Sequence, residues 1–141
     1  MIYDSTKILV LCTGNSCRSQ IAEGCLRRLL NEAGLAEAAS ALRSAGLTPH
    51  GLNPKAVEVM AEIGIDISGN TSDNLTQYLD IEFAYIITVC GNAAEHCPVF
   101  PGEGTRLHWP FEDPAGQKIK KFREVRDLID EKVRSWVVEN R

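Results

Sequence analysis

The sequence predicts an α/β protein: a single domain with a four-stranded parallel sheet flanked by helices on both faces. Two continuous apolar runs, residues 7–12 and 83–90, are typical of central strands that are covered on both faces. Segments with helical periodicity separate the expected strands, and this alternation favours parallel strands joined by right-handed crossovers. At 141 residues, with 44% apolar and 24% charged residues, the chain has the size and composition of one globular domain over residues 1–141.

The N-terminal half contains two expected strands and two expected helices. The strand over residues 7–12 leads into a short loop and a helix that ends near residues 31–34. A second strand is expected over residues 41–46. Asn53 as the cap and Pro54 in the first turn then begin a helix that ends before Gly64. The first helix is identified by apolar residues at helical spacing, which are Ile21, Ala22, Cys25, Leu26, Leu29 and Leu30.

The C-terminal half supplies the other two strands and the last helix. A polar loop over residues 66–74 precedes a short helix over residues 75–79, and the third strand covers residues 83–90. The fourth strand, residues 105–109, is followed by a turn-rich segment at residues 110–116. The last helix is indicated by apolar residues three or four positions apart, which are Phe122, Val125, Ile129, Val133 and Trp136.

Charge and hydropathy exclude several classes of function. The 15 Lys and Arg residues are outnumbered by 19 Asp and Glu residues, and the net charge of −4 argues against general binding to nucleic acid or to anionic membranes. No apolar run approaches the roughly 18 residues that a membrane span requires, and the first residues lack the pattern of a signal peptide. We therefore expect a cytoplasmic protein. The negative net charge is still compatible with a local site that binds an anion.

Five cysteines stand in this chain, at Cys12, Cys17, Cys25, Cys90 and Cys97. An odd number without a secretory signal argues against a disulfide framework, and the spacings do not match those of zinc ligands. Catalytic or redox cysteines are the leading interpretation. Cys12 and Cys90 each end an expected strand, and parallel sheets bind ligands beyond the carboxyl ends of their strands. We therefore expect both cysteines at one site.

The loop between the first strand and the first helix, CTGNSCRS, has the composition of an anion site that holds a nucleophile. Its backbone N–H groups and the helix dipole face one point, where we expect an oxyanion to contact Thr13, Gly14, Asn15, Ser16, Cys17 and Arg18. Arg18 adds a planar fork that matches two oxygens, and the local field favours the thiolate of Cys12. Ser19 is expected to donate a hydrogen bond to this sulfur. The alternative is that Cys12 is only a buried cysteine at the end of a strand and Arg18 only a surface residue. A Walker A loop is excluded, because the sequence has no G-x4-G-K-S/T pattern.

Six segments spread over nearly the whole chain resemble those of a known family. They are CTGNSCRSQIAEG, SAGL, HGLNP, DISGNTSDN, TVCGNAAEHCP and HWPFEDPAG, in this order. These segments are similar to those of the thioredoxin-coupled arsenate reductases, which share the fold of the low-molecular-weight protein tyrosine phosphatases. The resemblance implies a four-stranded parallel sheet flanked by helices, and the reduction of arsenate to arsenite.

The resemblance also implies a role for each of three cysteines. Cys12 is the nucleophile that attacks arsenate, Cys90 then attacks Cys12, and Cys97 resolves the resulting disulfide so that external thioredoxin can reduce the product. The alternative is a buried strand-end Cys90 and an incidental Cys97. The resemblance further implies that Asp113 is the general acid that protonates the departing oxygen. The alternative is that Asp113 only forms an ordinary Asp-Pro turn. Glu112 is interpreted as a solvated neighbour of this acid.

Some members of this family bind a potassium ion beside the anion loop. Hard oxygen donors stand at the matching positions here, which are Asn15, Glu23, Ser44, Thr71 and Asp73. The alternative is that Asn15, Ser44 and Thr71 only brace the loop through hydrogen bonds. We further expect Cys17 to have a packing role, Cys25 to lie in the core, and the protein to be a monomer.

Residues 91–97, between the second and third cysteines of the set, are expected to be helical in the reduced protein. A helix of this length keeps the α-carbons of Cys90 and Cys97 about 10 Å apart, whereas a disulfide needs them within about 7 Å. We therefore expect this segment to unwind when the two cysteines form a disulfide.

Three rival functions stay open. A low-molecular-weight tyrosine phosphatase would use the same loop, but such enzymes carry aromatic residues after the acid Asp-Pro pair, where this chain has Ala115 and Gly116. A glutaredoxin-coupled arsenate reductase differs only in its reductant, and Cys97 favours thioredoxin. A non-enzymatic oxyanion or metal sensor has no DNA-binding element or basic patch to support it.

Overall fold

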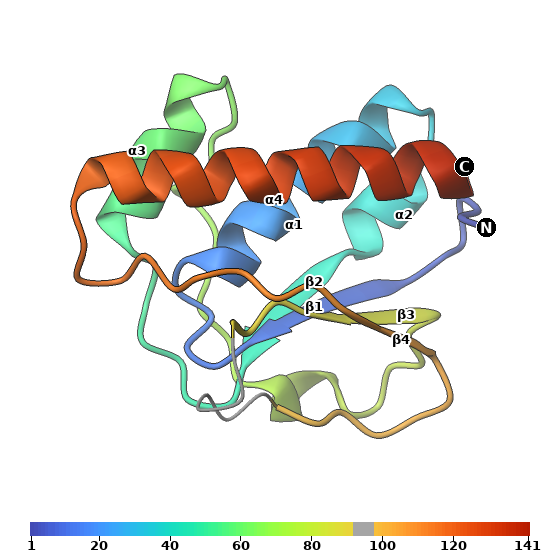
Figure 1. Cartoon of the computed structure of the whole chain (residues 1–141). Coiled ribbons are helices and arrows are strands. Elements are labelled where there is room, and N and C mark those ends of the chain that lie inside the picture. Colours follow the sequence, from blue (N-terminus) through green and yellow to red (C-terminus); the bar gives the residue numbers. More distant parts are fainter. Residues whose placement is uncertain (92–97) are drawn as a thin grey trace.

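The computed structural model describes residues 1–91 and 98–141, and a parallel sheet lies at its centre (Figure 1). Within these residues the sheet has four strands, which are β1 (Ile8–Cys12), β2 (Arg43–Gly46), β3 (Tyr85–Thr88) and β4 (Thr105–His108). All neighbouring strands are parallel, in the order β2-β1-β3-β4. In the register of the two central strands, Leu11 lies opposite Thr88. The predicted four-stranded parallel sheet is confirmed.

Helices lie on both faces of the sheet, but unequally. The helices α1 (Arg18–Glu32), α2 (Ala36–Ala41), α3 (Pro54–Glu62) and α4 (Ile119–Asn140) lie over one face, and the 3-10 helix η1 (Leu75–Tyr78) lies on the other (Figure 1). The long α4 crosses in front of α1 in this view (Figure 1). None of the helices that the structure describes is both long and apolar enough to cross a membrane.

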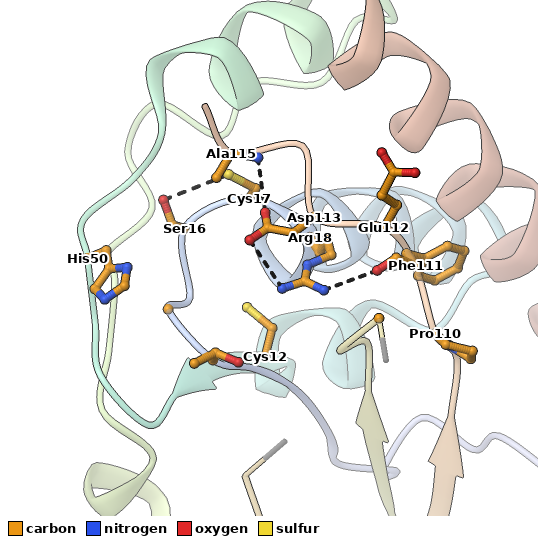
Figure 2. A pocket seen from close by; sticks show the side chains of 13 residues that line it. Cys12, Ser16, Cys17, Arg18, His50, Pro110, Phe111, Glu112, Asp113 and Ala115 are labelled. Atoms are coloured by element: carbon orange, nitrogen blue, oxygen red, sulfur yellow. Dashed lines mark hydrogen bonds and ion pairs between the residues drawn. The ribbon is translucent and has the colours of Figure 1, made fainter. Parts of the chain in front are cut away.

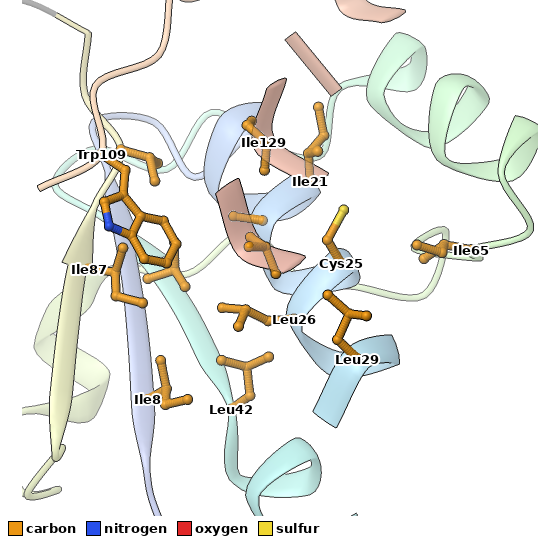
Figure 3. Packing of buried hydrophobic residues seen from close by; sticks show 14 of the residues in the cluster. Ile8, Ile21, Cys25, Leu26, Leu29, Leu42, Ile65, Ile87, Trp109 and Ile129 are labelled. Atoms are coloured by element: carbon orange, nitrogen blue, oxygen red, sulfur yellow. The ribbon is translucent and has the colours of Figure 1, made fainter. Parts of the chain in front are cut away.

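Side chains of β1 alternate between two cores, as the pleat of a strand requires. Ile8 and Val10 join the larger core beneath the helices, whereas Leu9 and Leu11 join a smaller core with Leu75 of η1. Figure 3 shows side chains from α1, α4 and the sheet that pack in the larger core, among them Ile8, Ile21, Leu26, Ile87 and Ile129. Burial on both faces explains why β1 is apolar at every position.

The start of β2 differs from the sequence prediction. Residues 36–41 form α2, where no helix is predicted, and the strand expected from residue 41 begins at Arg43. The six residues AEAASA carry no apolar stripe at helical spacing, and only Ala38 and Ala39 among them are buried. The short helix packs against α1, and a local pattern in the sequence does not report this contact.

The predicted beginning and end of α3 are confirmed. Asn53 Oδ1 accepts a hydrogen bond from Lys55 N at 2.9 Å, and Pro54 is the first residue of the helix. Gly64 follows the last turn with a φ of 79°, a left-handed conformation that favours glycine. A helix is also expected over residues 91–97. Of these residues the structure describes only Gly91, so this expectation and the position of Cys97 lie outside the described residues.

Candidate active site

A pocket of about 710 Å³ opens beyond the carboxyl ends of the strands. It is lined by the loop after β1, by the acid-containing segment after β4, and by His50 and Gly91 (Figure 2). Cys12 is the last residue of β1 and Arg18 is the first residue of α1, so the loop between them changes directly from strand to helix. Parallel sheets bind their ligands at this edge. The pocket is therefore the candidate active site.

A glycine of the neighbouring strand allows this loop to take its shape. A Cβ atom on Gly46, the last residue of β2, would lie only 2.7 Å from Thr13 O and 2.8 Å from Asn15 N. Asn15 has a φ of 47°, a left-handed conformation that asparagine adopts more readily than most residues. Its backbone N–H donates to Cys12 Sγ at 3.2 Å. Gly46 is thus a site residue that the sequence did not predict, because the loop and β2 are far apart in the chain.

Ser19 provides a second hydrogen bond to the candidate nucleophile. Its Oγ lies 3.0 Å from Cys12 Sγ and accepts a hydrogen bond from Asn15 Nδ2 at 2.8 Å. Because the Ser19 oxygen already accepts from Asn15, its own hydrogen is available to the sulfur. Cys12 is buried, and its sulfur lies within hydrogen-bond distance of both the Asn15 backbone N–H and the Ser19 hydroxyl.

The Asn15 amide also connects the loop to a buried polar network. Asn15 Nδ2 donates to Ser44 Oγ at 2.9 Å, and Ser44 Oγ donates to Glu23 Oε1 at 2.7 Å. The other carboxylate oxygen of Glu23 lies 2.9 Å from Arg27 Nη2. Asn15, Ser44 and Glu23 are all buried. The loop is therefore braced by side chains of both β2 and α1.

The residues expected to hold potassium lie together in the structure. Thr71 Oγ1 donates to Asp73 Oδ2 at 3.0 Å, and Asp73 N donates to Asn15 Oδ1 at 2.8 Å. One pocket beside the network is lined by Glu23, Ser44, Thr71 and Asp73, together with Arg27 and Arg43. Carboxylate, hydroxyl and amide oxygens are the donors that hard cations prefer. The donor set fits such an ion, and the hydrogen bonds among its members also brace the loop.

Arg18 connects the loop to the acid segment. Its buried guanidinium donates from Nη1 to Phe111 O at 3.0 Å, and its Nη2 lies 3.7 Å from Asp113 Oδ2. The side chain of Asp113 is 47% exposed, and its Oδ1 accepts a hydrogen bond from Ala115 N at 3.0 Å. Figure 2 shows the Arg18 guanidinium and the Cys12 sulfur pointing into the same space. The structure thus brings thiol, guanidinium and acid to one pocket, and their chemical roles stay predictions.

This fold and this loop match one family of proteins. Residues 7–140 match the family model described as low molecular weight phosphotyrosine protein phosphatase. The chain belongs to this family. Arsenate reductase 2 from Staphylococcus saprophyticus subsp. saprophyticus is 43% identical over 133 residues, which are 94% of this chain and 97% of that relative.

Solved structures with a similar fold support the same relationship. One, described as an arsenate reductase in oxidized state, is 34% identical with a TM-score of 0.79, over 95% of this chain and 98% of that chain. Another, an arsenate reductase in the phosphate binding state, is 33% identical with a TM-score of 0.76 and the same coverage. The expected resemblance to the arsenate reductases within the phosphatase fold is confirmed.

Two further cysteines of this phosphatase-family chain are buried thiols with raised pKa values. Burial raises the pKa of Cys17, which lines the pocket, to about 11. Burial also raises the pKa of Cys25, which lies in the larger core, to about 12 (Figure 3). Both thiols are therefore protonated at neutral pH, which fits packing roles rather than reactive ones.

Cys90 lies at the same edge of the sheet as Cys12. Val89 N donates to Leu11 O at 2.9 Å, so the pairing of β3 with β1 continues up to the residue before Cys90. Cys90 is 1% exposed and belongs to the same buried cluster as Cys12. Cys12 therefore ends β1, and Cys90 lies just beyond the end of the adjacent parallel strand β3.

His50 also lines the pocket, although the sequence assigns it no role. Its backbone N–H donates to Gly14 O at 2.9 Å. A Cβ atom on Gly14 would lie 2.9 Å from His50 Nδ1, so the glycine allows the imidazole to approach the anion loop. No local pattern signals this contact, because α1, α2 and β2 separate His50 from the anion loop in the chain.

Proposed function

We propose that this chain reduces arsenate to arsenite through Cys12, Cys90 and Cys97, and that thioredoxin regenerates it. The observation that carries the proposal is the Cys12 sulfur at the base of an anion loop, with the strand-end Cys90 following the adjacent strand. Hydrolysis needs only the first of these thiols, whereas reduction of arsenic(V) takes two electrons, which a second thiol supplies. Relatives named arsenate reductase, one of them in a phosphate binding state, support the substrate class.

The first step is nucleophilic attack on the bound oxyanion. The loop N–H groups and Arg18 hold the oxygens of arsenate, and Cys12 Sγ attacks the arsenic. An As–S bond forms while one As–O bond breaks, and arsenic stays in the pentavalent state. Asp113 gives its proton to the departing hydroxyl group of arsenate, which leaves as water.

The second step transfers the electrons. The thiolate of Cys90 attacks Cys12 Sγ, so that an S–S bond forms and the S–As bond breaks. The electron pair of the broken bond stays on arsenic, which leaves as arsenite. The thiolate of Cys97 then attacks the sulfur of Cys90, which releases Cys12 as a thiolate and leaves a Cys90–Cys97 disulfide. The dithiol of thioredoxin reduces this disulfide and is itself oxidised.

We further propose that this cycle runs in the cytoplasm and in a monomer. Among the described residues, Cys12, Cys17 and Cys25 are free thiols, which fits a reducing compartment. Thioredoxin is preferred over glutathione with glutaredoxin because the third cysteine makes an internal disulfide, the kind of bond that a dithiol protein reduces.

A potassium ion beside the loop is a separate part of the proposal. The oxygen atoms of Asn15, Glu23, Ser44, Thr71 and Asp73 would hold it. When bound, the ion supplies positive charge next to the network that fixes the Asn15 amide. Replacing NaCl by KCl at equal ionic strength is expected to lower the arsenate concentration that gives half the maximal rate, and an unchanged value would contradict the ion.

The central experiment compares two reducing systems. Arsenate-dependent oxidation of NADPH is measured with thioredoxin and thioredoxin reductase, and again with glutathione, glutaredoxin and glutathione reductase. We expect turnover in the first system and little in the second. Turnover only in the second would show that the reductant is wrong. Hydrolysis of an aryl phosphate without arsenite formation in either system would favour a phosphatase, which uses the same loop.

A further inference from the structure

Asp113 stands on a segment without helix or strand, although a general acid needs a fixed position. Residues 109–118 connect β4 to α4 without regular secondary structure. The side chain of Asp113 is 47% exposed, so burial does not hold it. A general acid acts only when its proton lies within hydrogen-bond reach of the leaving oxygen. Contacts that fix this segment therefore bear on the rate of the chemical step.

Glu112, the neighbour of the acid, is held from two sides. Lys121 Nζ lies 3.1 Å from Glu112 Oε2, and Gln117 Nε2 donates to the same oxygen at 3.3 Å. Gln117 Nε2 also donates to Asp113 O at 3.2 Å, and Gln117 N donates to Pro114 O at 2.9 Å. The segment is thereby folded back on itself around the backbone of Asp113. Glu112 is 60% exposed, as expected of a solvated neighbour of the acid, and it also pairs with Lys121.

Two helices anchor these contacts. Lys121 lies in the first turn of α4, and Lys55 Nζ, from the first turn of α3, donates to Gln117 O at 2.6 Å. The helices are in turn joined to each other, because Arg123 Nη2 of α4 lies 2.8 Å from Glu62 Oε2 of α3. The segment that carries the acid is therefore connected to a helix pair rather than hanging free from its two ends.

We propose that the Glu112–Lys121 ion pair is a positioning element that holds Asp113 over the anion loop. Neither residue takes part in a chemical step; both act through the placement of the acid. The inference rests on the acid role proposed for Asp113. The hydrogen bonds from Lys121 and Gln117 lower the pKa of Glu112, and the bond to Glu112 raises the pKa of Lys121. The pair therefore stays charged around neutral pH.

The test measures the first turnover of the reduced enzyme in the absence of thioredoxin. The rate of arsenite formation is followed at increasing concentrations of arsenate. Glu112→Gln and Lys121→Gln are expected to lower the limiting rate about threefold, the scale of an exposed ion pair, and to leave the half-saturating arsenate concentration unchanged. Lys121→Arg keeps the charge and should restore the rate. The matched control is Glu124→Gln, which removes the other carboxylate beside Lys121, at 3.3 Å, and should keep the wild-type rate.

Each outcome supports or overturns the positioning role. A double variant Glu112→Gln with Lys121→Gln should be no slower than either single variant, since both remove one interaction. If the single variants turn over at the wild-type rate while Asp113→Asn is slow, the positioning role is wrong and the acid role stands. If Asp113→Asn itself turns over normally, the acid role is wrong. A loss of rate accompanied by a lower melting temperature, and not restored by Lys121→Arg, would show a merely structural contact.

Discussion

At the scale of single residues, Asn15 decides how the polar groups around Cys12 are oriented. Its amide donates to Ser19 and Ser44 and accepts from the backbone of Asp73. An amide has fixed donors and a fixed acceptor, so changes of pH do not reverse these directions. An aspartate in its place would only accept, and the hydrogen of Ser19 would turn away from the sulfur. The hydrogen bond from Ser19 to the Cys12 sulfur therefore depends on Asn15, which its left-handed backbone conformation places beside both residues.

The role of the nucleophile is tested by Cys12→Ser. The hydroxyl is a much weaker nucleophile than a thiolate, whereas the loop N–H groups and Arg18 are retained. We expect arsenate reduction to fall at least about a thousandfold and aryl phosphate hydrolysis to disappear with it. Arsenate binding, followed by calorimetric titration, should stay within the same order of magnitude. Appreciable reductase turnover in this variant would contradict the mechanism.

The two chemistries of the loop are separated by Cys90→Ser. Only the redox half of the reaction needs the second thiol, so arsenate reduction should stop while weak hydrolysis of an aryl phosphate continues. Both activities are measured on the same preparation, and a melting curve reports whether the buried serine disturbs the fold, since Cys90 is 1% exposed. Equal loss of both activities would assign Cys90 a structural role.

At the scale of elements, the anion loop depends on the strand beside it. The last residue of β2, Gly46, lies against the backbone of Thr13 and Asn15, and its own N–H donates to Asp73 O at 2.8 Å. The loop, β2 and the segment around Asp73 are therefore packed as one unit. A side chain at residue 46 would have to displace backbone atoms, which do not move aside as the end of a flexible side chain does.

Gly46→Ala is therefore expected to damage the loop. We expect the free energy of unfolding to fall by about 1–3 kcal/mol, as in other overpacked sites, and arsenate binding to weaken strongly. Urea unfolding and calorimetric titration measure the two effects. The matched control is Gly69→Ala, because a Cβ atom on Gly69 would meet nothing within 4 Å. Equal arsenate affinity in the two variants would show that the close contact is unimportant.

The parts that the sequence predicts are those in which the signal is local. The alternation of apolar runs and helical periods predicts the sheet, and the loop from Cys12 to Arg18 is one continuous motif. The contacts of Gly46 with the loop and of Lys121 with Glu112 join separate segments, and no spacing in the sequence reports them. The sequence does not predict the short α2 for a related reason, since this helix packs against α1 and carries no apolar stripe of its own.

At the scale of the whole molecule, the site rests on the packing of α1. This helix begins with Arg18 and Ser19, and it contacts α2, α3 and α4. Its buried side chains, including Cys25, fill the larger core beneath α4 (Figure 3). We therefore expect a loss of core packing there to disturb Arg18 and Ser19 at the start of the same helix as well. The stability of the core thus sets the conditions under which the site is intact.

Because of Cys25, we expect the stability of the folded protein to fall as the pH rises in the alkaline range. Burial raises the pKa of its thiol from 9.0 to about 12 in the folded protein. Below pH 9 the thiol is protonated in both states, so its contribution to stability is fully present. Above pH 9 the unfolded chain releases a proton that the folded protein retains, and the free energy of unfolding falls by up to about 1.4 kcal/mol per pH unit.

Cys25→Ala removes this titration and tests the linkage. The variant should be less stable than the wild type at pH 7, because it leaves a small cavity under α4. Between pH 8 and about 10, its stability should decline less steeply than that of the wild type. Urea unfolding with a reductant present, repeated across this range, gives both slopes. Parallel slopes would mean that Cys25 does not contribute to the alkaline decline, and that the loss of stability arises from other groups.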